Sequence, residues 1–283
     1  MASSDHRIPA HLQSKRDLDG GLAIFRFELE DHLAFKPGQY ATLWLTYRGK
    51  TTPRPYSIAS SPSEKRVLEF YINLVETGHL TPSLWSPEIV RSLQLRDAET
   101  QVSVTGPKGR FLLDPNESRH LVFVASGTGL APFMSMIRTL NEDFRDSPRT
   151  FRRRSVCVIH GVSRPRHLGY REELERLAAE TLVDPGRQFT LSYLPTVSRP
   201  HLDPSWTGLT GRAETLFECD SIPASGIHSM QGAVRSLLNS TLRPETHLVC
   251  ICGYPGTVDS VVRLLSARGF KPDLDLKREK YYP

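Results

Sequence analysis

The chain has 283 residues and a formal net charge of +5, with 39% hydrophobic and 24% charged residues. This length exceeds the roughly 100–200 residues of a single domain, so we expect two domains, each with its own core. No stretch approaches the ~20 apolar residues of a membrane-spanning helix, and the residues up to Asp19 lack the apolar run of a secretory signal. We therefore expect a cytoplasmic protein without a membrane partner.

Cysteine spacing and charge limit the classes of site and partner. The four cysteines form neither a C-x-x-C pair nor an iron–sulfur spacing, so no metal site is predicted: they are Cys157, Cys219, Cys250 and Cys252. The basic balance favours an anionic partner, and charge alone leaves nucleic acid, a lipid headgroup and an acidic protein open. The run Arg152-Arg153-Arg154 lacks interleaved aromatics and precedes a strand-like segment, so we interpret it as a solvated loop and expect no nucleic-acid partner.

The first part of the chain consists of short β-like runs. They are rich in β-branched and aromatic residues, alternate partly in polarity and are separated by Gly, Pro and charged turns. We predict strands at Leu22–Leu29, Gly38–Tyr47, Val67–Val75 and Gln101–Thr105. This pattern is typical of an antiparallel barrel.

After Asp114-Pro115-Asn116, apolar strands alternate with helical stretches. We predict strands at Leu121–Ala125, Val156–Ile159, Phe189–Leu194 and Leu248–Cys252, and helices at Ala131–Asn141, Tyr170–Glu180 and Gly256–Arg268. Such alternation predicts a parallel sheet covered on both faces. The domain boundary should fall near residues 114–119.

Arg54-Pro55-Tyr56-Ser57 is the sharpest motif of the first part. Pro53 and Pro55 fix their own φ angles and push Arg54 into an extended conformation, so a guanidinium, a phenol and a hydroxyl project from a stiff segment. An arginine can clamp a pyrophosphate, a tyrosine offers a ring face and a donor, and a serine can bond a ring nitrogen. The prolines favour a barrel rim or edge. These groups suit a flavin dinucleotide; an edge strand with an exposed arginine is the alternative.

This motif resembles the R-x-Y-S flavin motif of the ferredoxin-NADP reductase superfamily. Three neighbouring segments resemble other family motifs in the same order: Lys36-Pro37-Gly38-Gln39-Tyr40, Phe70–Leu74 followed by Gly78–Thr81, and Gly106–Phe111. The resemblance implies an N-terminal antiparallel Greek-key β-barrel that binds FAD, in residues 1–115. It also implies a C-terminal α/β parallel-sheet domain that binds NADP, in residues 116–283.

The resemblance further assigns flavin contacts in the barrel. They are Arg54, Pro55, Tyr56 and Ser57 of the first motif and Tyr71, Ile72, Asn73, Leu74, His79, Leu80 and Thr81 of the second, with Thr81 at the pyrophosphate.

A glycine-rich turn follows the first strand of the second half, in Gly127-Thr128-Gly129-Leu130-Ala131-Pro132. Glycines let the backbone approach a phosphate, and the N-terminus of the following helix favours an anion. Pro132 stands where a Rossmann fingerprint has its third Gly. The segment instead resembles the family's G-T-G-x-A-P motif, which implies that Gly127, Thr128 and Gly129 face the pyrophosphate and nicotinamide.

The last predicted apolar strand ends in Cys250-Ile251-Cys252-Gly253-Tyr254-Pro255. Alternation places both cysteines on one face, with Cys252 nearer the carboxyl end, where open α/β sheets bind ligands. The segment resembles the family's C-G-x-P motif. That implies that Cys252 and Gly253 lie beside the nicotinamide, with the thiol as a steric and polar guide rather than a nucleophile. A buried structural cysteine is the alternative.

Recognition of a 2′-phosphate calls for arginines or hydroxyls near the adenosine ribose. The candidates are Arg164, Ser198 with Arg199, and Arg212 of Thr210-Gly211-Arg212. The last two segments resemble V-S-R and T-G-R of bacterial NADP-dependent members. NADPH is therefore favoured over NADH, while a plain surface role for each arginine is the alternative.

The terminal residues Glu279-Lys280-Tyr281-Tyr282-Pro283 resemble the family's acidic-x-aromatic-aromatic tail. The resemblance implies that Tyr281 stacks on the flavin, that Tyr282 lies near the adenine and that Glu279 lies near the reacting centre. Pro283 departs from the family pattern, and a disordered tail is the alternative.

The implied activity is that of a ferredoxin-NADP(+) reductase. Hydride passes between nicotinamide and flavin N5, with Ser57, Cys252, Glu279 and Tyr281 as catalytic residues, and single electrons pass to or from a separate protein. An acidic ferredoxin or flavodoxin is the expected partner of this basic chain, and a monomer is the expected state.

Two rival functions use the same motifs. The first is an NADH-dependent reductase component of an oxygenase, which would usually carry its own [2Fe-2S] domain and would not need the three arginines. The second is a non-catalytic flavin- or nucleotide-binding redox sensor, which has no need of Ser57, Cys252 and Glu279 together.

Overall fold

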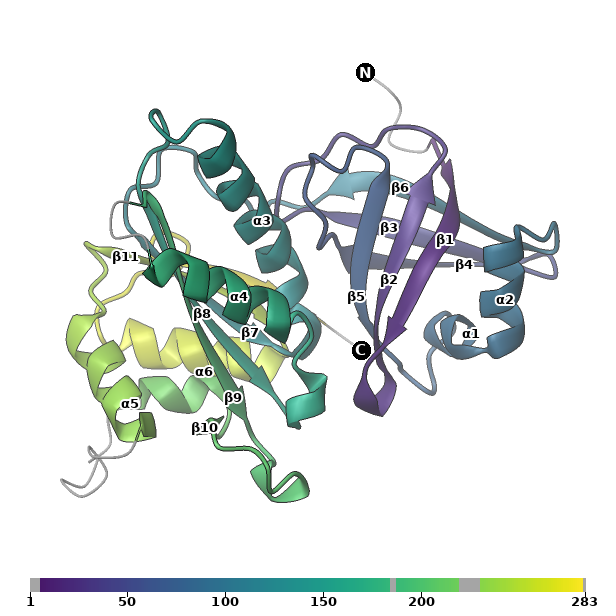
Figure 1. Cartoon of the computed structure of the whole chain (residues 1–283). Helices are drawn as coiled ribbons and strands as arrows, with labels where there is room; N and C mark the ends of the chain where they lie inside the picture. The colour runs from purple at the N-terminus through teal and green to yellow at the C-terminus, as the bar shows by residue number, and fades with distance from the viewer. Residues whose placement is uncertain (1–5, 184–186, 219–229, 282–283) are drawn as a thin grey trace. The chain divides into compact units, whose positions relative to one another are not determined.

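The computed structural model of the chain describes residues 6–183, 187–218 and 230–281 (Figure 1). Its strands are β1 (Ile8–Asp17), β2 (Leu22–Leu29), β3 (Tyr40–Tyr47), β4 (Lys50–Ser57), β5 (Val67–Asn73), β6 (Thr100–Lys108), β7 (His120–Ser126), β8 (Arg154–Val162), β9 (Phe189–Val197), β10 (Leu209–Thr210), β11 (His247–Gly253) and β12 (Leu276–Lys280). The helices are α1 (Thr81–Trp85), α2 (Pro87–Leu95), α3 (Ala131–Asp146), α4 (Arg171–Leu182), α5 (Met230–Thr241) and α6 (Pro255–Ser266). Short 3₁₀ turns also occur in these residues: η1 (Asp19–Gly21), η2 (Gly127–Leu130), η3 (Pro165–His167), η4 (Pro200–Leu202) and η5 (Ala213–Phe217).

The chain forms two compact units. One contains the described residues up to Pro115 together with the helical residues Ala131–Glu142, and the other contains Asn116–Leu130 and the described residues from Asp143 onward. Within the described residues, the chain therefore passes from one unit to the other at 115/116, at 130/131 and at 142/143.

The first unit is built on a six-stranded antiparallel sheet in the order β4-β3-β6-β1-β2-β5. Strand β6 returns to lie between β1 and β3, which is a Greek-key arrangement. The two outer strands approach each other at the bridge between Ile58, just after β4, and Phe70 of β5, where the Ala59 amide donates to the Glu69 carbonyl at 2.8 Å. The predicted N-terminal antiparallel barrel is confirmed.

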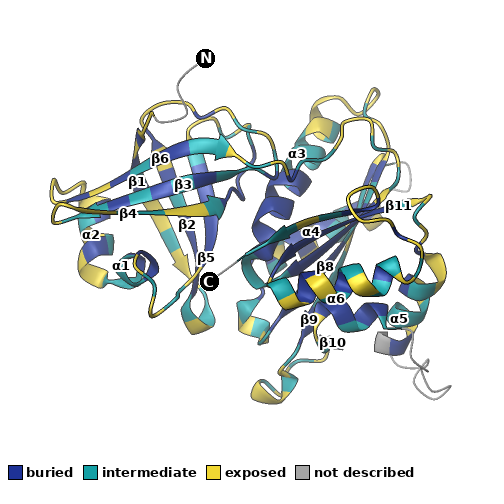
Figure 2. Cartoon of the chain, turned by 180° about the vertical axis from the view of Figure 1, so that it is seen from behind, coloured by how far each residue is buried: buried dark blue, intermediate teal, exposed yellow. Residues whose placement is uncertain are grey.

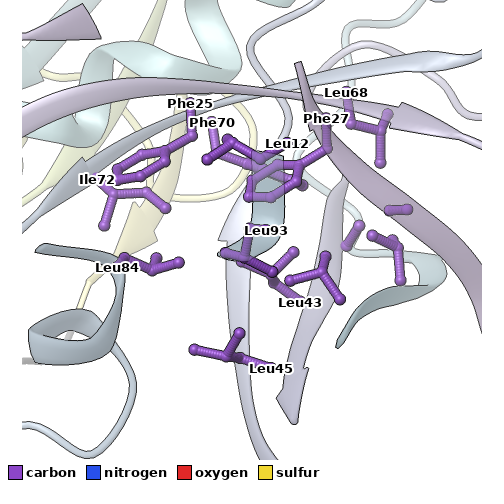
Figure 3. Close-up of a cluster of buried hydrophobic side chains, with 14 of the residues drawn as sticks. Leu12, Phe25, Phe27, Leu43, Leu45, Leu68, Phe70, Ile72, Leu84 and Leu93 are labelled. Carbon is purple, nitrogen blue, oxygen red and sulfur yellow. The ribbon is translucent and has the colours of Figure 1, made fainter. Parts of the chain in front are cut away.

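The core of this unit lies on the inner face of the sheet, where alternate residues point inward. Figure 3 shows Phe25, Phe27 and Phe70 packed with leucines of other strands and with Leu84 of α1 and Leu93 of α2. The sequence analysis did not predict α2. Its signals are local: Ser86 caps the helix by accepting from the Ile89 amide at 3.5 Å, and Arg96 ends it in a left-handed conformation.

Helix α3 is fastened to this unit by a buried carboxylate. Glu69, 4% exposed, accepts from Arg138 of α3 at 2.7 Å and from Arg26 of β2 at 3.0 Å. Arg138 also donates to the Ala59 carbonyl at 2.9 Å, and Phe133 packs on Phe111 with 5.6 Å between ring centroids. A buried charge needs such pairing, so Glu69 and the helix depend on each other.

The second unit is a parallel sheet in the order β10-β9-β8-β7-β11-β12. Figure 2 shows its central strands buried, while α4 and α6 each have a buried and an exposed face. On one face, α5, α6 and η5 pack on Val124 of β7, Ile159 of β8 and Ile251 of β11. The predicted C-terminal parallel-sheet α/β domain is confirmed.

Some elements of the second unit were not predicted. Strand β12 is rich in charge, and β10 is two residues long, so neither has the apolar run that signals a strand. The basic run at 152–154 is not wholly a solvated loop, because Arg154 begins β8 and is only 8% exposed, while Arg152 donates to the Asn116 carbonyl at 2.9 Å. Within the described ranges, no helix is both long enough and apolar enough to cross a bilayer.

Candidate functional site

The proline-rich motif Arg54–Ser57 forms the end of β4, which is an outer strand as the prolines predict. Arg54 is exposed and donates to the Pro53 carbonyl at 2.9 Å. Tyr56 packs its ring 6.0 Å from Phe70, and burial raises the pKa of its hydroxyl, which therefore keeps its proton. The motif thus presents a cation at the surface beside a neutral phenol and a buried Ser57.

The second predicted flavin segment lies alongside the first. Because Ile58 and Phe70 form an antiparallel bridge, Ser57, which precedes one, lies next to Tyr71, which follows the other. Tyr71 and Ile72 are buried, Asn73 is exposed, and the Leu74 amide donates to the Gly21 carbonyl at 2.6 Å. The sheet topology therefore brings together two segments that are separated by 13 residues in the sequence.

The Thr81 hydroxyl stabilises the turn that follows β5. Its hydroxyl accepts from the Val75 amide and donates to the Val75 carbonyl, both at 3.0 Å, and so closes the turn that contains His79 and Leu80. His79 is exposed, while Leu80 belongs to the barrel core. Because a hydroxyl has one proton to donate, the Thr81 side chain would have to release Val75 before it could donate to a phosphate.

In the second unit, the strand order reverses between β7 and β11. Strands β8 and β9 follow β7 on one side and β12 follows β11 on the other, so the carboxyl ends of β7 and β11 form the topological switch point of the sheet. Open α/β sheets bind ligands at this point. The predicted residues Gly127–Gly129 and Cys252–Gly253 meet there.

Two glycines make this meeting possible. A Cβ on Gly129 would lie 2.2 Å from the Cys252 carbonyl oxygen, and one on Gly253, whose φ is +129°, would lie 2.4 Å from the Ser126 carbonyl oxygen. The Ser126 hydroxyl also accepts from the Tyr254 amide at 2.7 Å. The turn after β7 and the end of β11 are therefore interlocked through backbone contacts.

Gly127 differs from these two glycines. Its φ is +54°, and no described heavy atom lies within 4 Å of the Cβ that a larger residue would place there. The turn is thus tight on the Gly129 side and open on the Gly127 side. A pyrophosphate can approach the backbone closely at such an uncovered glycine next to a helix N-terminus, so the residues present fit a dinucleotide.

Cys252 is completely buried at the end of β11. Burial raises its pKa well above the ordinary value, the neighbouring Glu279 raises it further, and a hydrogen bond from the Tyr281 side chain opposes the shift. Glu279 is the partner of Cys252 in the β11–β12 register, and the Tyr281 amide donates to the Gly253 carbonyl at 2.9 Å. The thiol therefore stays protonated. Tyr282 lies outside the described residues.

The three arginine segments come together at the carboxyl ends of β8, β9 and β10. The Ser198 amide donates to the Val162 carbonyl at 2.9 Å, and the Arg199 amide donates to the Ser163 carbonyl at 3.0 Å, which places Arg199 beside Arg164. The Gly211 amide donates to the Val197 carbonyl at 2.9 Å and so brings in Arg212, whose side chain is 67% exposed. A basic edge results from three segments spread over 49 residues of sequence.

The sequence analysis missed two polar residues behind the glycine turn. His160 of β8 is fully buried, with Nε2 3.1 Å from the Gly127 carbonyl oxygen and Nδ1 3.3 Å from the Tyr193 hydroxyl of β9. The available signal was a histidine near the end of an otherwise apolar strand. It could not be interpreted, because its partners come from two other segments.

A surface pocket of about 610 Å³ lies beside β9. It is lined by residues of α4, of β9 and of the loop before β10, among them Arg171, Tyr193 and Trp206, and by none of the predicted site residues. Among the residues that the structure describes, no cluster of three His, Cys, Asp or Glu side chains could hold a metal ion.

Comparisons with known proteins agree with this geometry. Residues 9–112 match the family described as "Oxidoreductase FAD-binding domain", and residues 123–263 match "Oxidoreductase NAD-binding domain". The chain is 27% identical over 264 residues to the phenol hydroxylase P5 protein of Acinetobacter pittii (strain PHEA-2), covering 93% of this chain and 63% of that protein. It is 29% identical over 254 residues to the ferredoxin–NADP reductase of Azotobacter vinelandii, covering 88% of this chain and 85% of that protein.

A solved structure shares the fold. The ferredoxin NADP+ reductase of Neisseria gonorrhoeae with bound FAD and NADP superposes with a TM-score of 0.71 at 20% identity, over 98% of each chain. Fold and matched families together define an FAD- and NAD-dependent oxidoreductase. The chain belongs to the ferredoxin-NADP reductase family, which confirms the resemblance seen in its motifs.

Proposed function

We propose that this reductase binds FAD in residues 1–115 and NADPH in residues 116–283 and exchanges single electrons with a separate ferredoxin or flavodoxin. The observation that carries the choice of NADPH is the basic edge formed by Arg164, Arg199 and Arg212. A 2′-phosphate is a dianion that arginine forks bind well, whereas the 2′-hydroxyl of NADH offers no such charge.

In the first unit, different residues of the two flavin motifs contact different parts of FAD. Arg54 is exposed and suits the pyrophosphate, Tyr56 offers a protonated hydroxyl, and Ser57 lies beside Tyr71, where a flavin ring nitrogen can be bonded. FAD, when bound, accepts a hydride and releases its electrons one at a time. Asn73 and His79 are exposed and available to the adenosine part, and Thr81 contributes by fixing the turn.

In the second unit, Gly127, Thr128 and Gly129 receive the pyrophosphate and Cys252 guides the nicotinamide. The raised pKa of Cys252 keeps the thiol neutral, so it neither attacks the ring nor repels the transferred hydride. Tyr281 is hydrogen-bonded to this thiol, and a nicotinamide ring seated beside Cys252 would take the place of that contact. Glu279, next to Cys252 in the sheet, is the acidic group nearest to this position in the register.

The electron partner is proposed from charge. The chain has a formal net charge of +5, which favours association with an acidic protein and predicts association that weakens with salt. A ferredoxin or flavodoxin has the one-electron chemistry that complements a hydride-accepting flavin. The similarity to a ferredoxin–NADP reductase from Azotobacter vinelandii supports this choice.

A second candidate is an NADH-dependent reductase component of an oxygenase. It is favoured by the similarity to the phenol hydroxylase P5 protein, of whose length this chain spans 63%. Under this alternative, the basic edge would not select the nucleotide, and Arg199→Gln would change NADPH and NADH oxidation equally.

The deciding experiment is the absorbance spectrum of the purified protein before and after anaerobic addition of NADPH or NADH. We expect flavin bands that NADPH bleaches faster and at lower concentration than NADH. Arg199→Gln should reduce this preference, whereas Arg176→Gln, a matched control at the exposed intrahelical pair with Glu180, should not. Preference for NADH would overturn the nucleotide assignment, and failure to bind any flavin would overturn the function.

A further inference from the structure

The glycine turn is held by a buried pair of residues that no family motif in the sequence identified. His160 lies on β8 directly beside Ala125 of β7 in the parallel register, and it has no exposed surface. The small Ala125 side chain leaves room for the imidazole to pass over β7. The ring thereby reaches the turn that follows that strand, with Nε2 3.1 Å from the Gly127 carbonyl oxygen.

The direction of both hydrogen bonds follows from chemistry. A carbonyl oxygen can only accept, so Nε2 must carry a proton. Burial lowers the pKa of His160 to about 4, so the ring is neutral near pH 7 and its other nitrogen is an acceptor. The Tyr193 hydroxyl, 3.3 Å from Nδ1, is therefore the donor at that end. Tyr193 lies on the same face of the sheet, because its register partner Val158 is two residues before His160.

The bond to Gly127 fixes more than one atom of the turn. In a trans peptide, the carbonyl of one residue and the amide of the next point in opposite directions, and the Gly127–Thr128 bond is trans. Drawing the Gly127 carbonyl towards His160 therefore directs the Thr128 amide away from it. Nothing described lies within 4 Å of a Cβ at Gly127, in contrast to Gly129, so this side of the turn is open.

We propose that His160 and Tyr193 are positioning residues for the dinucleotide: Tyr193 selects the imidazole tautomer, and His160 holds the Gly127 carbonyl so that the Thr128 amide faces the pyrophosphate. This inference rests on the proposed binding of a dinucleotide at the Gly127–Gly129 turn. It deepens that function by assigning the orientation of the turn to two side chains outside it.

The test compares ligands with and without a pyrophosphate. Wild-type holoenzyme is first titrated calorimetrically with NADP⁺ and NAD⁺. The dinucleotide that binds more tightly is then used in the titrations of the variants. Its mononucleotide, 2′-AMP for NADP⁺ or 5′-AMP for NAD⁺, lacks the pyrophosphate. His160→Phe retains a buried ring but no donor, and we expect it to weaken dinucleotide binding by about tenfold, since the side-chain hydrogen bond to the Gly127 carbonyl is lost. Mononucleotide binding should change by less than about twofold.

Two further variants separate positioning from packing. The side-chain amide of His160→Gln can still donate to the Gly127 carbonyl, so it should restore most of the dinucleotide affinity. Tyr193→Phe removes the donor to Nδ1 and should weaken dinucleotide binding by about threefold, because the tautomer is no longer selected. Retained flavin and a single cooperative unfolding transition serve as folding controls.

The outcomes are distinguishable. The proposal is overturned if His160→Phe binds the dinucleotide as wild type does, if it loses mononucleotide and dinucleotide binding equally, or if folded His160→Gln is as weak as His160→Phe. Should His160→Phe fail to fold, unchanged binding in folded Tyr193→Phe and weakened binding in folded His160→Gln would overturn it. A wild-type protein that binds neither dinucleotide overturns the proposed function itself.

Discussion

The two edges of the parallel sheet use charge in opposite ways. At the edge where the strands begin, Arg119 donates to Glu117 and Asp275, each at 2.8 Å, and to the Pro244 carbonyl at 3.1 Å. At the edge where they end, Arg199 is exposed, and its place is set by the hydrogen bond from its backbone amide to the Ser163 carbonyl rather than by its side chain. The paired charges of Arg119, Glu117 and Asp275 stabilise the fold. A charged side chain that is positioned by its backbone remains available to bind a ligand.

The largest effect should come from breaking the pairing at the first edge. Arg119→Met leaves Glu117 and Asp275, both nearly buried, without their shared cation, and we expect a loss of about 3–5 kcal/mol in the free energy of unfolding. Denaturant unfolding measures this. The exposed Arg176→Met, which removes the i,i+4 pair with Glu180, is the control and should cost less than about 0.5 kcal/mol. A similar loss in both variants would contradict the distinction between paired and exposed charge.

The next effect concerns the interlock at the second edge. Gly129→Ala places a methyl group 2.2 Å from the Cys252 carbonyl, so the backbone must move, at a cost of about 3 kcal/mol, and dinucleotide binding should be lost with it. Gly127→Ala meets no neighbour and should cost only about 1 kcal/mol through its left-handed backbone. Unfolding curves and nucleotide titrations of both variants check this. Equal costs would show that the interlock does not constrain the turn.

The two edges should also respond to acid in separate pH ranges. Burial lowers the pKa of His160 to about 4 from 6.5, so the unfolded chain binds its proton first and stability falls as pH drops from 6.5 towards 4. The hydrogen bond from Arg119 lowers the pKa of Glu117 to about 2 from 4.5, so its contribution is lost only as pH falls from 4.5 towards 2.

His160→Gln should therefore remove about 2 kcal/mol of the stability change between pH 6.5 and 5. Glu117→Gln should leave the fall in the free energy of unfolding between pH 6.5 and 5 unchanged. It should reduce the pH dependence of this free energy below pH 4.5. Chemical denaturation at a series of pH values is the measurement. If the free energy of unfolding of His160→Gln still falls between pH 6.5 and 5, another group titrates in that range.

The smallest effect in free energy is the one most specific to function. Arg199→Gln should weaken NADP⁺ binding by about tenfold, or ~1.4 kcal/mol, with no change in NAD⁺ binding or in unfolding temperature. Calorimetric titration with the two nucleotides checks this. A parallel loss for both nucleotides would place Arg199 away from the 2′-phosphate.

The sequence predicted those parts of the molecule whose signals are local. Alternating strands, strand–helix alternation and short motifs such as Arg54–Ser57 and Gly127–Gly129 each carry their information within a few residues. What escaped was non-local. The contact of His160 with Gly127 and Tyr193 depends on the register of three strands, and the occupation of the Thr81 hydroxyl by Val75 depends on the closure of a turn. A residue type indicates which hydrogen bonds its side chain can make, whereas the fold determines which partner lies within reach.

The fastening of helix α3 to the barrel bears on how such proteins can be recombined. A hybrid joined at Asn116 to the second half of a relative would exchange α3 along with the parallel sheet. The barrel would then meet a foreign residue where Arg138 neutralises Glu69, and a foreign ring where Phe133 packs on Phe111. The barrel unit is therefore made of two segments that are separated in the sequence. A working chimera must keep residues 131–142 together with the first half, although they lie within the second half of the chain.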